Sequence, residues 1–126
     1  MKLNPDCVRD ILMCVESIPD VKCHYVFNRS TIEQDLPKYS YDEVCYHIRQ
    51  CELSGFFYKA HSSLDGDWSI TDLSPKAHEF LANIRQDNIW EGVKCIAEKV
   101  GSFSISTLAA IASNILTELV RNHFRI

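Results

Sequence analysis

The sequence has little glycine and little proline, four residues of each among 126, and no low-complexity or strongly charged tail. With 46% apolar residues, this composition is typical of a folded globular chain and argues against disorder. No apolar segment is long enough to span a bilayer, so we expect no membrane association. The first ten residues, MKLNPDCVRD, lack the apolar run of a signal peptide. We therefore expect a cytoplasmic protein.

Sequence motifs that would indicate a particular enzymatic reaction or a bound metal or phosphate are missing as well. We find no Gly-rich phosphate loop, no HExxH, no paired-carboxylate site and no C-x-x-C among the six cysteines. In a reducing compartment such cysteines are expected to be thiols in the core, without disulfides or bound metal. Cys45 and His47 would point about 200° apart on a helix, so they cannot form a nucleophile pair, and we expect His47 at the edge of the core. We expect no catalytic residue, cofactor or metal, and an unrecognised enzyme is the least favoured alternative.

The most informative stretch is SYDEVCYHIRQCELSGFF, at residues 40–57. Ser40 followed by Glu43 is a capping-box pattern, and Gly55 supplies a left-handed helix end. The residues between them predict one helix with an apolar stripe of Tyr41, Val44, Ile48 and Cys51. A helix that ends in Ser-Gly and continues at once as a strand is typical of the join between the third helix and the wing of a winged-helix domain.

Further elements are predicted on both sides of this stretch. Before it we expect a helix that begins at Pro5 after an Asn4 cap and ends before Pro19, an edge strand at residues 21–27, and a short helix capped by Thr31 with Gln34 in the capping-box position. After it we expect two strands at residues 56–61 and 68–73, joined through Asp65 and Gly66. This hairpin would be the wing.

Three helices are predicted in the remainder. Ser74 and Pro75 begin the first, whose apolar face is Ala77, Phe80, Leu81 and Ile84. Asp87 or Asn88 would cap the second, with Trp90 beside a stripe of Ile89, Val93, Ile96, Ala97 and Val100, and Gly101 would end it. The last, at residues 104–121, is apolar over more than half its surface, so it either packs across its own domain or pairs with a second copy. The candidate oligomer interface is Leu108, Ile111, Ile115 and Leu119.

The sequence thus predicts an α+β, mostly helical protein. Residues 1–73 would form a winged-helix-like core, and residues 74–126 would form a C-terminal helical extension that packs on the core or forms a dimer interface.

The chain also resembles a known family through four segments: MKLNPDCVRDIL, YSYDEVCYHIRQCELSGFF, LSPKAHEFLANIRQDNIW and the Ser/Ile/Leu/Ala-rich last helix. This is the bacterial and prophage family of the domain of unknown function 2513, and the resemblance covers nearly the whole length. It implies a winged-helix-like core with a helical tail and an origin in bacteria, phages or mobile elements. It implies no activity and supplies no catalytic residues.

The charge distribution bears on the choice between nucleic acid and protein as the partner. The net charge is −4, and residues 40–73 alone carry two basic residues, Arg49 and Lys59, against six acidic ones. A winged helix usually places its third helix in the major groove. Here the outward residues of that helix would be Asp42, Tyr46, Arg49, Gln50 and Leu53. DNA affinity depends largely on Lys and Arg contacts to phosphate, so this acidic surface disfavours DNA.

An exposed Leu53 beside Tyr46 is instead more typical of a protein interface. We therefore predict a non-enzymatic regulatory or interaction protein that binds a protein partner or a second copy of itself. The alternative is a dimeric winged-helix transcriptional regulator that binds DNA. The candidate partner or nucleic-acid surface is Asp42, Tyr46, Arg49, Gln50, Leu53 and Lys59.

Overall fold

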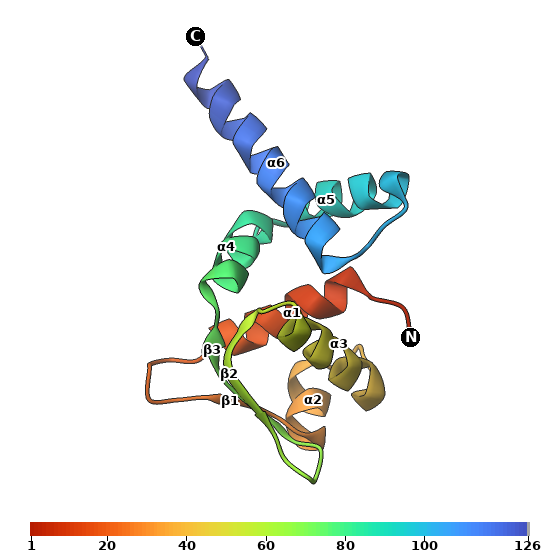
Figure 1. Cartoon of the computed structure of the whole chain (residues 1–126), viewed down its shortest axis with the longest axis vertical. Helices are drawn as coiled ribbons and strands as arrows, with labels where there is room; N and C mark the ends of the chain where they lie inside the picture. The colour runs from red at the N-terminus through yellow and green to blue at the C-terminus, as the bar shows by residue number, and fades with distance from the viewer. Residues whose placement is uncertain (126) are drawn as a thin grey trace. The chain divides into compact units, whose positions relative to one another are not determined.

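In the computed structural model, which describes residues 1–125, the chain forms six helices and one three-stranded antiparallel sheet (Figure 1). The elements in order are α1 (Pro5–Glu16), β1 (Tyr25–Phe27), α2 (Arg29–Asp35), α3 (Tyr41–Leu53), β2 (Phe57–Ser62), β3 (Trp68–Leu73), α4 (Pro75–Ile84), α5 (Asp87–Val100) and α6 (Ile105–Phe124). The predicted α+β, mostly helical class is confirmed. The chain divides into two compact units, residues 1–78 and the residues from Glu79 onward, which we describe separately. The predicted boundary after residue 73 stays a prediction.

Helix α1 begins as the sequence predicts. The Asn4 side chain accepts a hydrogen bond from the Asp6 backbone N–H at 3.0 Å, and Pro5 occupies the first turn, where its missing N–H has no helical partner to lose. Five residues of one face are fully buried: Cys7, Val8, Ile11, Leu12 and Val15. Because α1 contacts both α3 and β3, this face forms the centre of the core of residues 1–78.

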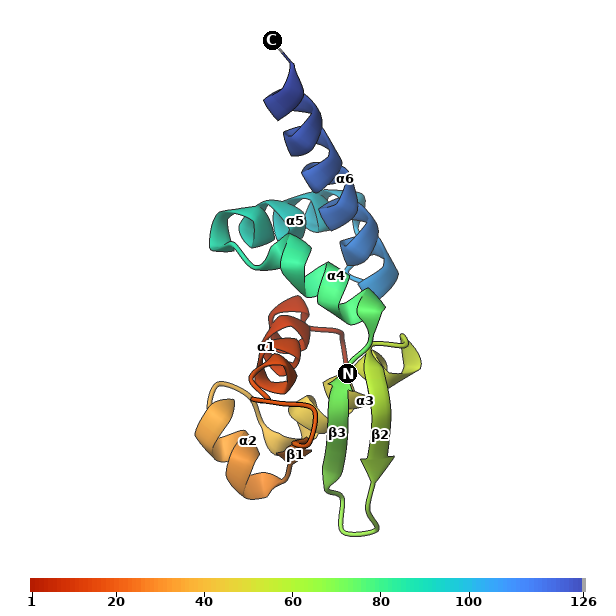
Figure 2. The ribbon, with the colours of Figure 1, turned by 90° about the vertical axis from the view of Figure 1, so that its left-hand side faces the viewer.

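The sheet has the order β1-β3-β2, so β1 lies at an edge as predicted (Figure 2). The strand is shorter than the expected residues 21–27, because regular pairing covers only Tyr25, Val26 and Phe27 against β3. Upstream, the Asp20 carboxylate accepts a hydrogen bond from the Lys22 N–H, and Val21 is exposed. This local side-chain turn competes with strand formation and explains the late start of β1.

The predicted hairpin is present, with β2 and β3 paired from Phe57 opposite Leu73 to Ser62 opposite Trp68. The regular pairing is interrupted at Lys59, whose φ of 55° places a non-glycine residue in the left-handed region. Burial along β3 changes phase across this point, because Trp68 and Ile70 are buried at alternate positions whereas the next buried residue is Leu73. The register is the same on both sides of this point, since Tyr58 pairs with Asp72 and Ala60 pairs with Ile70.

Helix α2 is capped by Asn28 rather than by Thr31, so the predicted cap was wrong. The Asn28 side chain accepts from the Thr31 N–H at 2.9 Å, and the Thr31 hydroxyl accepts from the Asn28 N–H at 2.9 Å. Thr31 is therefore the reciprocal member of the capping box, and Gln34 has no part in it. Leu36 ends the helix, and Pro37 follows it.

Helix α3 begins and ends at the predicted residues, with Ser40 as its cap, but the structure shows only the Ser40 half of the predicted capping box. The Ser40 hydroxyl accepts from the Glu43 N–H at 3.1 Å. At the other end, Gly55 has a φ of 75°, its N–H donates to the Glu52 carbonyl, and the Phe56 N–H donates to the Cys51 carbonyl. These two hydrogen bonds form a Schellman motif, which turns the chain from the helix into β2 within three residues.

The prediction that His47 lies at the edge of the core was wrong. Its side chain is fully buried beside Val44, Ile48 and Cys51 on the inner face of α3. The Nε2 atom accepts a hydrogen bond from the Asn4 backbone N–H at 2.7 Å, and Nδ1 donates to the Glu43 carbonyl at 2.7 Å. These partners require the neutral tautomer protonated at Nδ1. His47 therefore joins the start of α1 to the middle of α3.

Helix α4 begins at Pro75, where the Ser74 hydroxyl accepts from the Ala77 N–H at 3.2 Å, as the Ser-Pro pair predicts. In the second unit, α5 begins after Gln86, which makes no side-chain capping bond, so the predicted Asp87 or Asn88 cap was wrong. The buried stripe of α5 is Trp90, Val93 and Ala97, whereas Ile96 and Val100 are exposed. Trp90 thus belongs to the centre of the stripe rather than to its side.

Helix α6 begins after Ser104, whose hydroxyl accepts from the Thr107 N–H at 3.2 Å, and it extends to Phe124, three residues beyond the predicted end. Its buried residues, Ile105, Leu108 and Ala112, all lie in the first half of the helix, which packs against α5. Across residues 1–125, no helix combines the length and the apolar character needed to cross a membrane.

Candidate functional site

The outer face of α3 is the first candidate site. It consists of Asp42, Tyr46, Arg49, Gln50 and Leu53, which recur at helical spacing opposite the buried Val44, Ile48 and Cys51. Asp42 and Arg49 are exposed, and Tyr46 and Gln50 are partly exposed. Leu53 is 73% exposed at the last turn. The helix therefore brings all five predicted residues to one accessible face.

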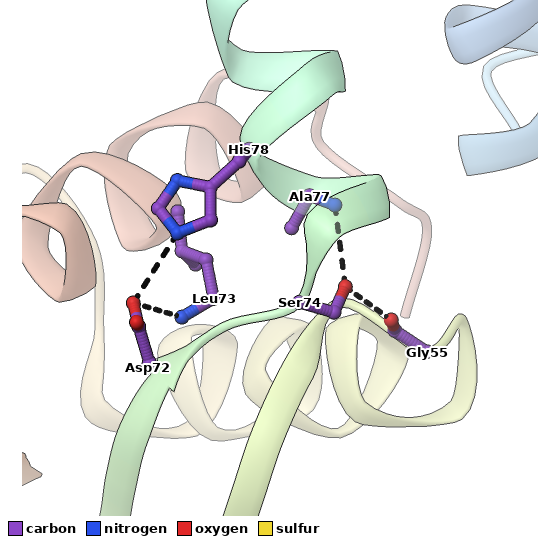
Figure 3. A network of polar contacts seen from close by, with 6 residues as sticks. All are labelled: Gly55, Asp72, Leu73, Ser74, Ala77 and His78. Atoms are coloured by element: carbon purple, nitrogen blue, oxygen red, sulfur yellow. Dashed lines mark hydrogen bonds and ion pairs between the residues drawn. The ribbon is translucent and has the colours of Figure 1, made fainter.

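A network of backbone carbonyls and side chains holds the end of this helix (Figure 3). The Ser74 hydroxyl donates to the Gly55 carbonyl at 2.6 Å, and the Ser74 N–H donates to the Phe56 carbonyl at 2.9 Å. Lys76 donates from Nζ to the Ser54 carbonyl at 3.0 Å, where a cation also complements the negative end of the helix dipole. The end of α3, the start of β2 and the start of α4 are thus tied together next to Leu53.

The same network includes one side chain pair. The Asp72 carboxylate accepts from the Leu73 N–H at 2.7 Å and lies 3.3 Å from the His78 Nε2 atom (Figure 3). Both side chains are about half exposed, so the pair contributes at most about 1 kcal/mol to stability. We assign it a local role at the start of α4.

At the other end of α3, Tyr41 connects the helix to the hairpin turn. Its hydroxyl donates to the Gly66 carbonyl at 3.1 Å, and the Arg29 guanidinium lies 4.0 Å from the centre of its ring. A Cβ atom on Gly66 would come within 2.8 Å of the Tyr41 oxygen, and Gly66 has a φ of 86°. The turn of the wing is therefore fitted closely against Tyr41 and requires glycine.

Lys59, the remaining residue of the predicted surface, is exposed on β2. Its Nζ atom lies 5.4 Å from the centre of the Tyr58 ring, and its backbone is the non-glycine position with positive φ among residues 1–125. A lysine in this conformation is strained by about 1 kcal/mol or more. The structure does not bring Lys59 onto the outer face of α3, since it belongs to the wing.

The predicted oligomer interface changes in one respect. Leu108 is fully buried within the chain, so it is not available to a second copy, and including it was wrong. The other three residues line a groove of about 330 Å³ between α5 and α6, formed by Ile96, Ile111, Asn114, Ile115, Glu118 and Leu119. Beyond this groove, Val120 and Phe124 continue the exposed apolar surface of α6.

A pocket that the sequence did not suggest lies within residues 1–78. It measures about 460 Å³ and is lined by residues from α1, β1, α2 and the segment before α3, among them Asp10, Cys14, Tyr25, Asp35 and Tyr39. The Tyr39 hydroxyl donates to Asp10 at 2.7 Å, and the Tyr25 hydroxyl donates to Asp35. We call it the tyrosine–aspartate pocket. Its residues are spread over 30 positions of sequence without a spacing pattern, so no sequence signal indicated it.

The cysteines of this unit favour the protonated form. Burial raises the pKa of Cys14 to about 11, with Asp35 and Asp10 adding to the shift, and burial together with Glu43 and Asp10 raises the pKa of Cys7 to about 12. Burial likewise raises the pKa of Cys45. A thiolate is the reactive form of cysteine, so these thiols are poorly suited to act as nucleophiles at neutral pH.

The part of the chain that the structure describes contains no candidate metal site. Within residues 1–125, no three His, Cys, Asp or Glu side chains are grouped so that they could hold a metal ion. The ring of His47, moreover, is occupied on both nitrogens by backbone groups.

Comparison with known proteins gives a family and one relative. A family model described as "Hypothetical protein (DUF2513)" matches residues 2–104. An uncharacterized protein of Haemophilus influenzae is 24% identical over 123 residues, which cover 95% of this chain and 99% of the relative. No solved structure matches the chain.

Proposed function

The chain belongs to the DUF2513 family, whose description assigns no activity, and we propose that it is a non-enzymatic interaction module that binds a protein partner. The proposal has three parts: a winged-helix-like arrangement of residues 1–78, a protein-binding surface on the outer face of α3, and self-association through the α5–α6 groove. Each part rests on its own observation.

The order of elements supports the winged-helix-like arrangement. A helix, a short edge strand, two helices and a β-hairpin follow one another from α1 to β3, and β1 pairs with β3 on the side away from β2. The immediate join of α3 to β2 through Gly55 supports the same reading. The short α2, with seven residues, is the main departure from a standard helix-turn-helix.

The observation that carries the partner proposal is the exposed Leu53 on an acidic surface. Leu53 lies at the rigidly held end of α3, in the same row as Tyr46 and Gln50. Interfaces bury apolar and aromatic side chains at their centre and keep charges at the rim. Residues 1–78 carry twelve acidic and eight basic residues, so a partner surface with a basic rim would be complementary.

Affinity capture from host cell extract with matched variants tests this proposal. Leu53→Asp removes the exposed apolar side chain of α3, whereas Leu64→Asp makes the same chemical change at a fully exposed leucine in the hairpin turn. We expect a protein that is captured by the wild type and by Leu64→Asp and is lost with Leu53→Asp, as quantified by mass spectrometry. Equal recovery with both variants would remove the outer face of α3 as the binding surface.

DNA binding is the second candidate, because Arg49 and Gln50 lie together on the face that a winged helix presents to the major groove. Arg can pair with guanine and Gln with adenine. The six acidic residues at positions 40–73 weigh against this candidate, since they would approach the phosphates as well.

For self-association we propose a second copy of this chain on the α5–α6 groove. Residues from position 79 onward carry five basic and five acidic residues, so two copies of this unit do not repel each other, whereas two copies of residues 1–78 do. Leu119, Val120 and Phe124 are each about half exposed or more on α6. A helix with such a face next to a groove of matching character is suited to an isologous contact.

Mass measurement by light scattering tests the dimer. We expect Ile115→Glu to give a monomer, because Ile115 lines the groove, and Ser113→Glu, exposed on the opposite side of α6, to stay dimeric. A wild-type protein that is monomeric at about 100 µM contradicts the proposed affinity, since a functional dimer of this kind has a dissociation constant well below that concentration.

Two further observations argue against a nucleophile pair of Cys45 and His47, which is consistent with the proposed module. All six cysteines are free, and burial raises the pKa of the thiols of Cys7, Cys14 and Cys45. His47, the imidazole nearest to Cys45 in sequence, is engaged by Asn4 and Glu43 in the core.

A further inference from the structure

We propose that the tyrosine–aspartate pocket binds an organic cation, an ammonium or guanidinium group carried on a short aliphatic stem. This pocket is separate from the outer face of α3, so the inference does not depend on the protein-partner proposal. Its volume of about 460 Å³ is within the range of sites that hold small ligands or single long side chains.

The direction of the hydrogen bonds around the pocket favours a ligand that donates hydrogen bonds. The Tyr25 hydroxyl donates to Asp35, the Tyr39 hydroxyl donates to Asp10, and the Ser17 hydroxyl donates to the Cys14 carbonyl at 2.6 Å. Each of these three hydroxyl hydrogens is therefore committed, so the hydroxyl and carboxylate oxygens of the lining are left with acceptor capacity. A ligand that binds these oxygens must supply the donors.

The charge of the lining is the second argument. Asp10 and Asp35 each accept a hydrogen bond from a tyrosine hydroxyl. A carboxylate has room for several hydrogen bonds, so one neutral donor leaves most of its capacity open. Lys38 is the basic residue of the lining, and it is exposed.

The pKa values of the side chains next to Asp10 and Asp35 agree with a site for a cation. Burial, with a smaller contribution from the negative charges of Asp35 and Asp10, raises the pKa of Cys14 to about 11. Burial and the hydrogen bonds to Asp35 and Asp10 also raise the pKa of Tyr25 and of Tyr39. The pocket thus disfavours any additional negative charge, and its thiol remains neutral at physiological pH.

The aromatic and apolar parts of the wall select the form of the cation. Tyr25 and Tyr39 bring two ring systems to the pocket, and Met13, Leu36 and Pro37 add apolar surface. Aromatic faces attract alkylammonium and guanidinium groups, and apolar walls cover an aliphatic stem. A bare metal ion would leave these walls unused, so an organic cation fits better.

A titration followed by ¹H–¹⁵N NMR tests the inference with three probes: n-butylguanidinium, n-butylammonium and the neutral n-butylurea. We expect saturable binding of at least one cation in the millimolar range or tighter, with the largest shifts at the amides of Met13, Cys14 and Lys38. The neutral urea should bind at least about tenfold more weakly, because it lacks the charge. Equal binding of the urea, or shifts confined to other residues, would overturn the proposal.

Charge-removing variants provide the second test. The double variant Asp10→Asn, Asp35→Asn should weaken cation binding at least about tenfold, whereas Glu33→Gln, an exposed acid on α2, should change it less than about twofold. Lys38→Gln, at an exposed position that does not threaten folding, should strengthen it. Unchanged affinity in the double variant, or weaker binding after Lys38→Gln, contradicts the proposal.

A fourth probe, a capped peptide with a single arginine, distinguishes between two sources of the cation. Binding of the peptide as tightly as n-butylguanidinium indicates a side chain of a protein partner, and binding of the free cations alone indicates a small amine metabolite. Both results support a cation pocket. Leu53→Asp should bind every probe normally, so failure of the partner proposal and failure of this one are distinguishable.

Discussion

The two units of the chain, residues 1–78 and the residues from Glu79 onward, are each stabilised by a different kind of internal contact. In the first unit, polar groups far apart in sequence are joined: His47 with Asn4, Tyr39 with Asp10, and Tyr41 with Gly66. In the second unit, Trp90, Val93 and Leu108 are buried along α5 and α6, and the contact between Glu118 and Arg121 is local. The first unit therefore gains specificity from partly buried polar contacts, and the second leaves part of an apolar face exposed.

The largest expected effect tests the apolar packing of the second unit. Leu108→Ala should lower the free energy of unfolding by about 2–5 kcal/mol, because the fully buried side chain leaves a cavity. Leu119→Ala, at a half-exposed position of the same helix, should cost less than about 1 kcal/mol. Urea unfolding, at a protein concentration low enough to favour the monomer, measures the free energy of unfolding of both variants. Equal losses of stability in the two variants would contradict the assignment of Leu108 to the core.

The next effect tests the polar anchoring of the first unit. His47→Leu keeps the volume of the side chain but leaves the Asn4 N–H without its acceptor, so the free energy of unfolding should fall by about 1–3 kcal/mol. His61→Leu, on the exposed part of β2, is the matched control and should stay within about 0.5 kcal/mol of the wild type. If both substitutions have the same small effect, the buried imidazole does not stabilise the contact between α1 and α3.

An effect of similar size tests the fit of the hairpin turn against α3. Gly66→Ala should cost about 1–3 kcal/mol, because it combines a positive φ with a contact to the Tyr41 oxygen. Gly55→Ala has a similar φ but open space around the new Cβ, so it should cost about 1 kcal/mol. In a Tyr41→Phe background the cost of Gly66→Ala should fall to that of Gly55→Ala. A double-mutant cycle by thermal unfolding that shows no coupling would contradict the close fit.

The smallest effect concerns the start of α5. Gln86 makes no side-chain capping bond, so Gln86→Ser should raise the free energy of unfolding by about 0.5–1 kcal/mol. Ser104→Ala is the opposite change, because it removes an existing helix cap in the same unit. It should lower the free energy of unfolding by about 1 kcal/mol. Calorimetry measures both, and a loss of stability in Gln86→Ser would show that the position serves another contact.

Local chemistry explains how much of this fold could be predicted from the sequence. The ends of α3 were predictable because Ser40 and Gly55 act through bonds to residues at most five positions away. The hairpin was predictable from the turn residues Asp65 and Gly66. Leu53 and Arg49 were placed correctly on the outer face because helical spacing alone decides the face.

The features that the sequence did not reveal depend on distant partners. His47 was assigned to the edge of the core because imidazole is polar, and its acceptor role depends on Asn4, 43 residues away. The predicted buried face of α5 differs from the observed one, because Trp90 is buried and Ile96 is exposed. Which residues of α5 are buried depends on where α6 crosses the helix rather than on periodicity. The tyrosine–aspartate pocket combines residues from separate elements, and no spacing rule connects them.

The most direct test of the central claim, that the outer face of α3 binds protein rather than DNA, is a titration of the wild-type protein against random duplex DNA at about 50 mM salt. Non-specific electrostatic binding is strongest there and typically has a dissociation constant of about 10⁻⁴ M or tighter. With six acidic residues against two basic ones at positions 40–73, we expect no saturable binding up to about 100 µM protein. Saturable binding that weakens with added salt and is lost in Arg49→Gln would contradict the claim.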